Sequence, residues 1–485
     1  MLDYIVIALY MLGMIGIGVW STKRSKNDED FLVAGRRLGP LLYSGTMAAV
    51  VLGGASTVGA VGLGYQYGIS GMWLVFSIGC GLLLLSLAFA AWINRLEVYT
   101  VAQMFELRYG PGASLLTGIV MAAYTFMLSV TSTVAYGTIF GVLFELDRVP
   151  AILLGGGVVI LYSVLGGMWS ITLTDFVQFI VKTVGIFFIM LPILLVKAGG
   201  WEGMHTALPE TAFSITHIGT QTIITYFVVY FLGLVIGQDI WQRVFTAKSE
   251  GVAKWAGFAS GVYCILYAFA GALIGMCAKV LLPNIEVRDT VYPTIVEYAL
   301  PVGIAGLVMA AALSAIMSTS SGALIATATV VKEDIVEKLA PSKGGSAATP
   351  HGERDEIRNS RIYILIFGIL MIGAACVVRG VVEALTIAYD ILVGGLMVAI
   401  IGGFIWPRGT IKGALASIIA GTALTLGTMF VMKDVFANEP IFYGIVGSLV
   451  VYVVVSLMTA PTPAAIRDEW NRRKATKREE VAPAA

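Results

Sequence analysis

The chain has 485 residues, of which 58% are hydrophobic and only 13% charged, and its 31 basic and 30 acidic residues give a net charge of +1. With 56 glycines and a mean hydropathy of +0.87, it is much more apolar than soluble domains, in which apolar residues and glycine make up about 45–50%. The composition excludes a soluble enzyme and predicts a membrane protein, and the balanced charge offers no basic excess for nucleic acid.

A membrane-spanning helix needs about 20 mostly apolar residues. The sequence predicts thirteen such helices in an all-α polytopic fold. They lie at residues 4–20, 42–64, 71–95, 112–142, 149–167, 170–197, 219–246, 252–280, 301–330, 359–379, 382–406, 411–432 and 438–459. The polar loop 340–357 and the tail 461–485 have the composition of flexible segments outside the membrane.

Basic residues predict the orientation of the chain, because cytoplasmic loops collect Lys and Arg. With the N-terminus outside, 24 of the 31 basic residues fall on inner loops and six on outer loops, and Lys182 lies within a helix. We therefore expect a multi-pass protein of the cell (inner or plasma) membrane, with its N-terminus outside and its C-terminus in the cytoplasm.

Two of the predicted helices contain glycine-rich interruptions. The helix at 42–64 contains Gly53-Gly-Ala-Ser-Thr-Val-Gly59, and the helix at 219–246 contains Gly233 and Gly237. An unwound segment within lipid is tolerated where it lines a cavity, because its backbone polar groups need partners. Interruptions at matching places in two inverted halves indicate a midplane substrate and ion site. The alternative is that these glycines only permit close helix packing.

The ninth predicted helix carries a cluster of oxygen atoms that suits a cation. Its Ala315 carbonyl and the hydroxyls of Ser318 and Thr319 fall within one turn and converge on one side. Carbonyls freed where the second helix unwinds, at Ala55 and Val58, would add two more ligands. Oxygen ligands of this kind suit a hard cation such as sodium. The alternative is that the hydroxyls bond to carbonyls of their own helix.

Ionisable residues inside membrane spans are functional candidates by default. Here they are Asp175, Lys182, Asp239 and Asp390. A structural alternative is that Lys182 pairs with Asp175 or Asp390. Asp239 and Arg243, four residues apart, would likewise pair with each other.

Five motifs occur along the chain in the order found in one transporter family. They are Asp30-Phe-Leu-Val-Ala-Gly-Arg-Arg-Leu-Gly39, the Gly-Ala-Ser of the second helix, Gly-Gly-Met-Trp…Thr174-Asp175-Phe-Val-Gln178, Gln242-Arg243…Ala-Lys-Ser249 and Met317-Ser-Thr…Glu333-Asp334-Ile335. With these motifs the chain resembles the sodium:solute symporters, relatives of the sodium-coupled proline, sugar, sialic acid, pantothenate and choline transporters.

The resemblance implies a five-plus-five inverted-repeat fold of the leucine-transporter type, in which helices 1, 12 and 13 are peripheral. The corresponding segments are helix 1 with its cytoplasmic loop (1–41), the first repeat with helices 2–6 (42–200), the second repeat with helices 7–11 (201–406), helices 12–13 (407–460) and the cytoplasmic tail (461–485).

The resemblance also implies one sodium ion, held by Ala55, Val58, Ala315, Ser318 and Thr319. A second sodium, held by Asp175, Ser318 and Ser321, is the alternative. Against it, Gly322 stands where the best-defined second site has a serine.

The solute site is expected on the helices that surround the two interruptions. Its candidate residues are Val58, Gly59, Gly62, Trp73, Phe76, Ser77, Tyr124, Thr131, Tyr230, Gln238, Asp239, Trp241, Thr386 and Asp390. Gly59 and Gly62 stand where the sugar and proline carriers keep polar groups, so their substrates do not transfer to this chain. Asp239 would suit a cationic amine and Lys182 a carboxylate, which leaves the solute class open.

These expectations describe a transporter and not an enzyme. The chain is expected to import a small polar organic solute with sodium by alternating access, in a lipid bilayer and without an obligate protein partner. The alternatives are a proton-coupled transporter that uses Asp175 or Asp390, and a membrane solute sensor.

Overall fold

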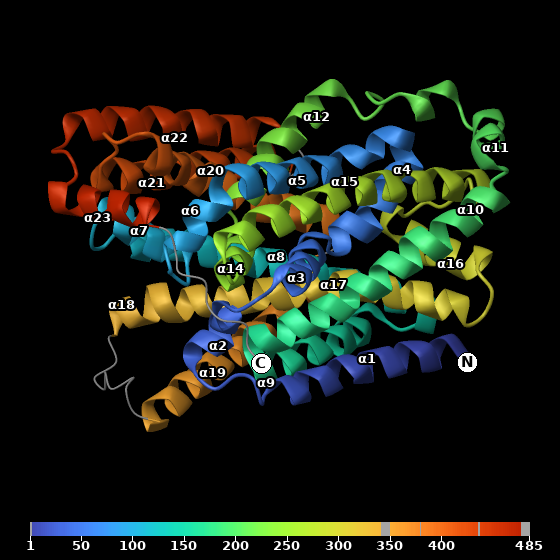
Figure 1. Cartoon of the computed structure of the whole chain (residues 1–485). Coiled ribbons are helices and arrows are strands. Elements are labelled where there is room, and N and C mark those ends of the chain that lie inside the picture. Colours follow the sequence, from blue (N-terminus) through green and yellow to red (C-terminus); the bar gives the residue numbers. More distant parts are fainter. Residues whose placement is uncertain (1, 341–349, 379, 435–436, 477–485) are drawn as a thin grey trace.

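The structure is a computed structural model that describes residues 2–340, 350–378, 380–434 and 437–476. Within these ranges the chain is built from helices, and its only β-type pairing is an isolated bridge between Leu38 and Ala247. The prediction of an all-helical protein is confirmed. Figure 1 shows most of the long helices running roughly parallel, with α2, α7, α18 and α23 at one end and α11 and α16 at the other.

The α-helices follow one another along the whole described chain. They are α1 Leu2–Ser21, α2 Asp28–Val33, α3 Pro40–Val51, α4 Ala60–Tyr67, α5 Trp73–Leu84, α6 Ala90–Arg95, α7 Val101–Tyr109, α8 Ser114–Phe144, α9 Arg148–Thr183, α10 Leu191–Lys197, α11 Gly200–Ala207, α12 Thr220–Tyr226, α13 Leu232–Ile236, α14 Gln238–Thr246, α15 Glu250–Leu281, α16 Val291–Ala299, α17 Ile304–Val330, α18 Glu337–Leu339, α19 Pro350–Val377, α20 Val381–Ile405, α21 Ile411–Met432, α22 Glu439–Met458 and α23 Ala464–Ala475. Five π-helical segments connect some of them, at Ala55–Gly59, Leu85–Phe89, Val184–Met190, Phe227–Phe231 and Val331–Val336.

Ten helical stretches of the described chain are long and apolar enough to cross a membrane, and the bent pair formed by Thr220–Ile236 and Gln238–Thr246 would make an eleventh. Two of the ten stretches, Ala55–Arg95 and Arg148–Lys197, have 41 and 50 residues. Each contains a glycine with positive φ, Gly68 at 63° and Gly167 at 56°, a conformation that favours glycine because it has no Cβ.

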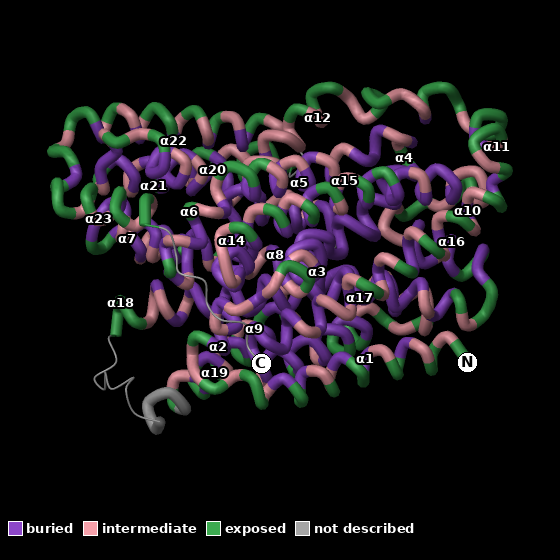
Figure 2. The backbone as a smooth tube through the Cα atoms, viewed as in Figure 1, coloured by how far each residue is buried: buried purple, intermediate pink, exposed green. Residues whose placement is uncertain are grey.

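The helices differ in how much of their surface faces the protein interior. In an 18-residue apolar segment of the stretch that contains α17, 89% of the residues are buried, against 22% in the corresponding segments of α1 and α21. Figure 2 shows buried residues concentrated in the middle of the assembly, around α3, α8, α9 and α17. Large apolar side chains such as Leu9 and Phe430 point outward, at 64% and 83% exposure. This pattern fits a central core of helices with a lipid-facing surround.

Both predicted helix interruptions are present in the structure. Helix α3 ends at Val51, and Leu52 has the non-helical angles φ −100° and ψ 75°. The second interruption is at Gly237, with φ −67° and ψ 132°, where the pair of helices bends by 40°. Close packing contributes too, because a Cβ on Gly53 would lie 2.5 Å from the hydroxyl oxygen of Thr319.

A backbone connection links the chain before the first interrupted helix to the end of the second. The amide of Leu38 donates to the carbonyl of Thr246 at 3.0 Å, and the amide of Lys248 donates to the carbonyl of Leu38, also at 3.0 Å. Since Leu38 precedes α3 and Thr246 ends α14, the two interrupted helices are joined through main-chain atoms.

The C-terminal tail differs from the expectation of a flexible segment. Residues Ala464–Ala475 form α23, whose Trp470 is only 4% exposed and packs edge-on against Phe404 at 5.3 Å. The Lys474 ammonium lies 4.8 Å from the centre of the Trp92 ring, and burial lowers the pKa of Lys474. The tail is ordered there because its aromatic side chain finds an apolar partner, which the polar average of the segment conceals.

The structure describes only some residues of the loop 340–357 and of the tail, the two segments that were expected to be flexible. Residues 341–349 of the loop 340–357 and residues 477–485 of the tail lie outside the described residues, and α19 begins at Pro350.

Candidate ion and solute site

The predicted sodium ligands on α17 meet the last turn of α3. The Ser318 hydroxyl oxygen lies 2.8 Å from the carbonyl oxygen of Ala49 and 3.0 Å from that of Ala315, and these two carbonyls share its single hydrogen. Thr319 donates to the carbonyl of Val50 at 2.6 Å. Both hydroxyl side chains are buried. The structure therefore brings three of the five predicted ligands to the first interruption.

The other two predicted ligands, Ala55 and Val58, follow the interruption in the π-helical segment Ala55–Gly59. The Ala55 carbonyl accepts a hydrogen bond from the backbone amide of Ala60. Ala55 and Thr319 line the same small cavity of ≈ 20 Å³. A cavity needs about 10–15 Å³ to hold one water molecule. The cavity therefore has room for a particle the size of one water molecule, and Val58, Ala315 and Ser318 are not among the residues that line it.

The buried Lys182 on α9 faces this same interruption. Its ammonium donates to the carbonyls of Ala49 and Leu52 at 3.4 and 3.3 Å. It also lies 5.8 Å from the centre of the Tyr267 ring. The lysine thus contacts backbone oxygens at the end of α3, whereas the sequence offered carboxylates as its alternative partners.

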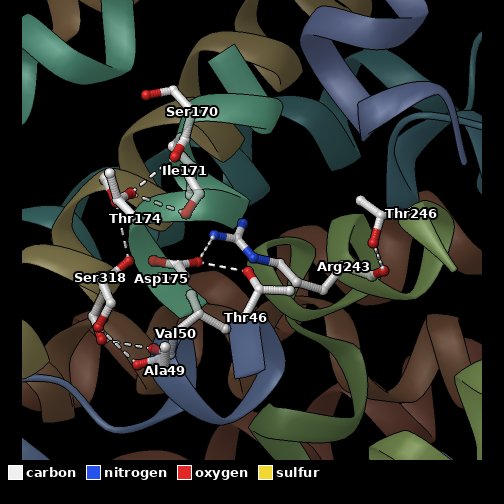
Figure 3. A network of polar contacts seen from close by, with 12 residues as sticks. Thr46, Ala49, Val50, Ser170, Ile171, Thr174, Asp175, Arg243, Thr246 and Ser318 are labelled. Atoms are coloured by element: carbon white, nitrogen blue, oxygen red, sulfur yellow. Dashed lines mark hydrogen bonds and ion pairs between the residues drawn. The ribbon is translucent and has the colours of Figure 1, made fainter. Parts of the chain in front are cut away.

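Asp175, the carboxylate predicted for a second sodium, has partners on two other helices (Figure 3). The Oδ2 atom of Asp175 accepts a hydrogen bond from Thr46 at 2.6 Å and lies 3.3 Å from a guanidinium nitrogen of Arg243. Asp175 and Arg243 are both fully buried. Ser321 donates to the backbone carbonyl of Ser318 at 3.2 Å. Asp175 therefore already has a positive partner within the protein.

Gly322 provides the room for this guanidinium. A Cβ on Gly322 would lie 2.7 Å from the Nη2 atom of Arg243 and 2.6 Å from a methyl carbon of Val50. The alternative in which Arg243 pairs with Asp239 on its own helix is wrong, because the Oδ1 atom of Asp239 accepts a hydrogen bond from the hydroxyl of Tyr124 at 2.9 Å. The partner of Arg243 comes from α9, which sequence spacing alone does not reveal.

A larger cavity of ≈ 280 Å³ lies beside α12 and α20. Of the predicted solute residues, Tyr230, Thr386 and Asp390 line it, and the hydroxyls of Tyr230 and Thr386 are 3.0 Å apart. Asp390 is 2% exposed, and its Oδ1 atom has no hydrogen-bond partner among the described residues. Arg288 and Thr225 also line the cavity. Sequence reasoning missed both, because neither lies in a recognisable motif.

The two predicted glycines on the second helix pack against residues of this cavity. A Cβ on Gly59 would lie 2.8 Å from a methyl carbon of Val382, and a Cβ on Gly62 would overlap the side chain of Arg288. Val382 and Arg288 both line the cavity. The glycines therefore shape the site by leaving space, and contribute no polar group to it.

Tyr389 lines the small cavity at the interruption and packs against a residue of the larger one. It lines the small cavity together with Asp239 and Thr131. Its ring centre lies 5.3 Å from that of Tyr230, which lines the larger cavity, and 5.6 Å from that of Tyr124. Tyr389, another residue that the sequence did not identify, thus connects the predicted solute and ion regions.

The remaining predicted solute residues have structural partners. The side chains of Trp73, Ser77 and Trp241 donate to backbone carbonyls at 2.6, 2.8 and 2.8 Å. Phe76 packs edge-on against Trp73, with the ring centres 5.1 Å apart. The amide group of Gln238 holds the start of α7, accepting from one backbone amide at 2.7 Å and donating to a backbone carbonyl at 3.0 Å.

The chain is similar to known sodium-coupled transporters. The chain is 25% identical to a sodium/proline symporter of Staphylococcus aureus (strain bovine RF122 / ET3-1), an alignment that covers 98% of this chain and 96% of the relative. The fold of this chain is similar to that of a Na+-coupled sialic acid symporter in a substrate-bound outward-open state, with a TM-score of 0.79 and 19% sequence identity. The match covers 96% of this chain and 99% of the symporter.

A second solved structure shows the same fold at greater distance. It is Mhp1, a nucleobase-cation-symport-1 family transporter in a closed conformation, with a TM-score of 0.60, 14% identity and coverage of 91% and 98%. The model of the sodium:solute symporter family matches residues 31–421, which is most of the chain. The chain therefore belongs to the sodium:solute symporter family.

Proposed function

We propose that this protein imports a small polar organic solute together with sodium by alternating access. The observation that carries the proposal is the contact of Ser318 and Thr319 with the end of the interrupted α3, beside a cavity of ≈ 20 Å³. Family membership and the two sodium-coupled relatives named above support it. Sodium bound there would hold α3 against α17. By linkage, sodium and solute would each raise the affinity of the other by the same factor.

The proposal includes thirteen membrane crossings, of which ten form two inverted repeats of five and three, the first and the last two, are peripheral. Gly68 and Gly167 would divide the stretches of 41 and 50 residues into two crossings each, since about 20 residues suffice for one. The interrupted helices α3–α4 and α12–α14 would each form one crossing. The N-terminus would be outside, because 24 of 31 basic residues then fall on inner loops. The membrane would be the inner or plasma membrane.

We propose that the larger cavity receives the solute. Its volume of ≈ 280 Å³ suits a small molecule. Asp390 has an unpartnered buried carboxylate oxygen there, and Arg288 contributes a cation to the same cavity. A buried charge needs a partner of opposite sign. Arg288 already pairs with Asp289 at 3.4 Å, so the unmet charge is that of Asp390. A zwitterionic solute would place its amine toward Asp390 and its carboxylate toward Arg288.

One sodium is proposed rather than two. The Arg243 guanidinium neutralises Asp175, and Gly322 provides no hydroxyl in the space that the guanidinium fills. A second sodium at this carboxylate would be repelled by the resident cation. The five ligands predicted for the first sodium, Ala55, Val58, Ala315, Ser318 and Thr319, remain the proposed site.

The direct test is uptake into proteoliposomes under separate gradients. A thermal-shift screen of zwitterions, monocarboxylates, sugars and quaternary amines first identifies a solute that stabilises the purified protein. We expect uptake of that solute with an inward sodium gradient, and none with an equal potassium gradient. Uptake driven by a pH gradient alone, and unchanged when sodium is removed, would replace sodium coupling with proton coupling.

A further inference from the structure

Lys182 occupies an unusual place for a lysine. It is fully buried in the second half of α9, after the kink at Gly167. Its ammonium bonds to the carbonyls of Ala49 and Leu52. These carbonyls lie where α3 ends, and the last carbonyls of a helix have no partner within it. The lysine thus uses the backbone oxygens that the interruption frees.

One of these two oxygens, the carbonyl oxygen of Ala49, also contacts Ser318, a proposed sodium ligand. Ser318 donates to the carbonyl of Ala49 at 2.8 Å, and the Lys182 ammonium contacts that carbonyl at 3.4 Å. A lysine ammonium is a compact monovalent cation with up to three donors on a flexible stem. It therefore places a positive charge beside the carbonyl oxygens at this interruption, as a bound sodium ion would do.

The local charge count favours competition between the two cations. Two buried cations, Lys182 and Arg243, and two buried carboxylates, Asp175 and Asp239, lie around the interruption, and Arg243 and Thr46 already contact Asp175. A sodium ion brought next to the Ala49 carbonyl would add a third positive charge. Like charges a few ångströms apart in a buried site repel strongly.

The lysine also has a place to withdraw to. The ring centre of Tyr267 lies 5.8 Å from its ammonium nitrogen, within the range of a cation–π interaction. The Tyr267 hydroxyl is in turn 2.7 Å from the hydroxyl of Thr57, in the π-helical segment after the interruption. A move of the ammonium toward this ring would release the carbonyls of Ala49 and Leu52 without taking the charge into lipid.

We propose that Lys182 is a tethered cation that competes with sodium for the interruption in α3. In the sodium-free protein its ammonium holds the end of α3, and bound sodium displaces it from the Ala49 carbonyl. The positive charge of Lys182 therefore lowers the affinity for sodium and sets the concentration at which the site fills. This inference rests on the proposed sodium coupling.

The test is a sodium titration followed by thermal unfolding of the purified full-length protein, with potassium chloride holding the ionic strength constant. Lys182→Met removes the charge and keeps the length of the side chain, while Lys182→Arg keeps the charge. The matched control is Lys197→Met, on an exposed lysine of α10. We expect Lys182→Met to lower the half-saturating sodium concentration at least about tenfold. Lys182→Arg and Lys197→Met should stay near wild type.

The outcomes separate this inference from the proposed function. An unchanged half-saturating concentration in Lys182→Met, with a raised one in Ser318→Ala, overturns the competition and leaves sodium coupling standing. Loss of the sodium response in Lys182→Met also overturns it. If Lys182→Met responds to sodium and the wild-type protein does not, the result supports Lys182 as a tethered cation and contradicts sodium coupling in the wild-type chain. If Lys182→Met does not fold, Lys182→Gln serves for the same comparison.

Discussion

The guanidinium of Arg243 lies 3.3 Å from the carboxylate of Asp175, and both side chains are completely buried. Arg243 belongs to α14, which follows the second interruption, and Asp175 to α9. The same carboxylate oxygen accepts a hydrogen bond from Thr46 of α3. One oxygen atom therefore joins both interrupted helices to a third helix (Figure 3).

Breaking this pair should destabilise the protein strongly. Removing one partner of a buried pair leaves an uncompensated charge and costs about 3–5 kcal/mol. We expect Arg243→Gln and Asp175→Asn each to lower the melting temperature clearly, and the double variant to recover part of the loss. Glu469→Gln, which breaks an exposed pair with Arg472 on α23, is the control and should change little. Strictly additive losses in the double variant would contradict the pairing.

The hydroxyls at the first interruption should control the response to sodium. Replacing Ser318 or Thr319 by Ala removes a proposed ligand, and the half-saturating sodium concentration should rise by roughly tenfold or more. Ser314→Ala is the matched control, because Ser314 lies one turn earlier on α17 and bonds to Tyr10 and to the Ala310 carbonyl. The measurement is the sodium-dependent thermal shift. An equal rise in all three variants would exclude a specific ion site.

Gly322 should not tolerate a side chain. Gly322→Ser would press on Arg243, since even a Cβ lies 2.7 Å from its Nη2 atom, and overpacking of this kind costs about 1–3 kcal/mol. Gly373→Ser on α19, where a Cβ meets nothing within 4 Å, is the control. Unfolding midpoints in the same detergent provide the comparison. A Gly322→Ser protein as stable as Gly373→Ser would show that the guanidinium has another position available.

The charges in the larger cavity should determine the affinity for the solute. Loss of a hydrogen bond to a charged group costs about 1.5–3 kcal/mol, so Asp390→Asn or Arg288→Gln should raise the half-saturating solute concentration roughly 10- to 100-fold. Glu383→Gln, on the same helix as Asp390 but not at the cavity, should leave it unchanged. Binding is measured by thermal shift with the solute found in the screen. Normal affinity in both cavity variants would place the solute elsewhere.

The tail helix should detach when its aromatic contact is removed. Trp470→Ala deletes the side chain that packs against Phe404, and α23 then has few buried apolar contacts to oppose local unfolding. We expect faster amide hydrogen exchange across Ala464–Ala475 while the rest of the protein keeps its protection. Trp20→Ala, at a residue that is 52% exposed, is the control. Unchanged exchange in the tail would mean that Arg95, which donates to the Lys474 carbonyl, is sufficient to hold it.

The sequence predicted those features that depend on local composition. Apolar length predicted the helices, and the glycines near Gly53 and at Gly237 predicted the two interruptions. The position of Ala315, Ser318 and Thr319 within one turn predicted that the carbonyl and the two hydroxyls lie together. The choice of partner carbonyls, Ala49 and Val50, was not predictable, because it depends on how far α3 extends before it unwinds.

Contacts between distant helices were also not predictable from the sequence. Arg243 pairs with Asp175, 68 residues away, although Asp239 is only four residues from it. Which of the two carboxylates pairs with Arg243 depends on how the helices pack. The spacing of residues along one helix does not reveal that packing. The same reason explains why Arg288 and Tyr389 were missed. Trp470 was hidden in a segment whose average composition is polar.

The connection between Leu38 and the end of α14 consists only of main-chain amides and carbonyls. Its strength therefore does not depend on which side chains stand at these positions, with the exception of proline, which has no amide hydrogen to donate. Substitutions at these positions, other than by proline, would therefore keep the two interrupted helices linked. Such a link would not be visible in a comparison of residue identities, because it uses only main-chain atoms, which do not change with the side chain.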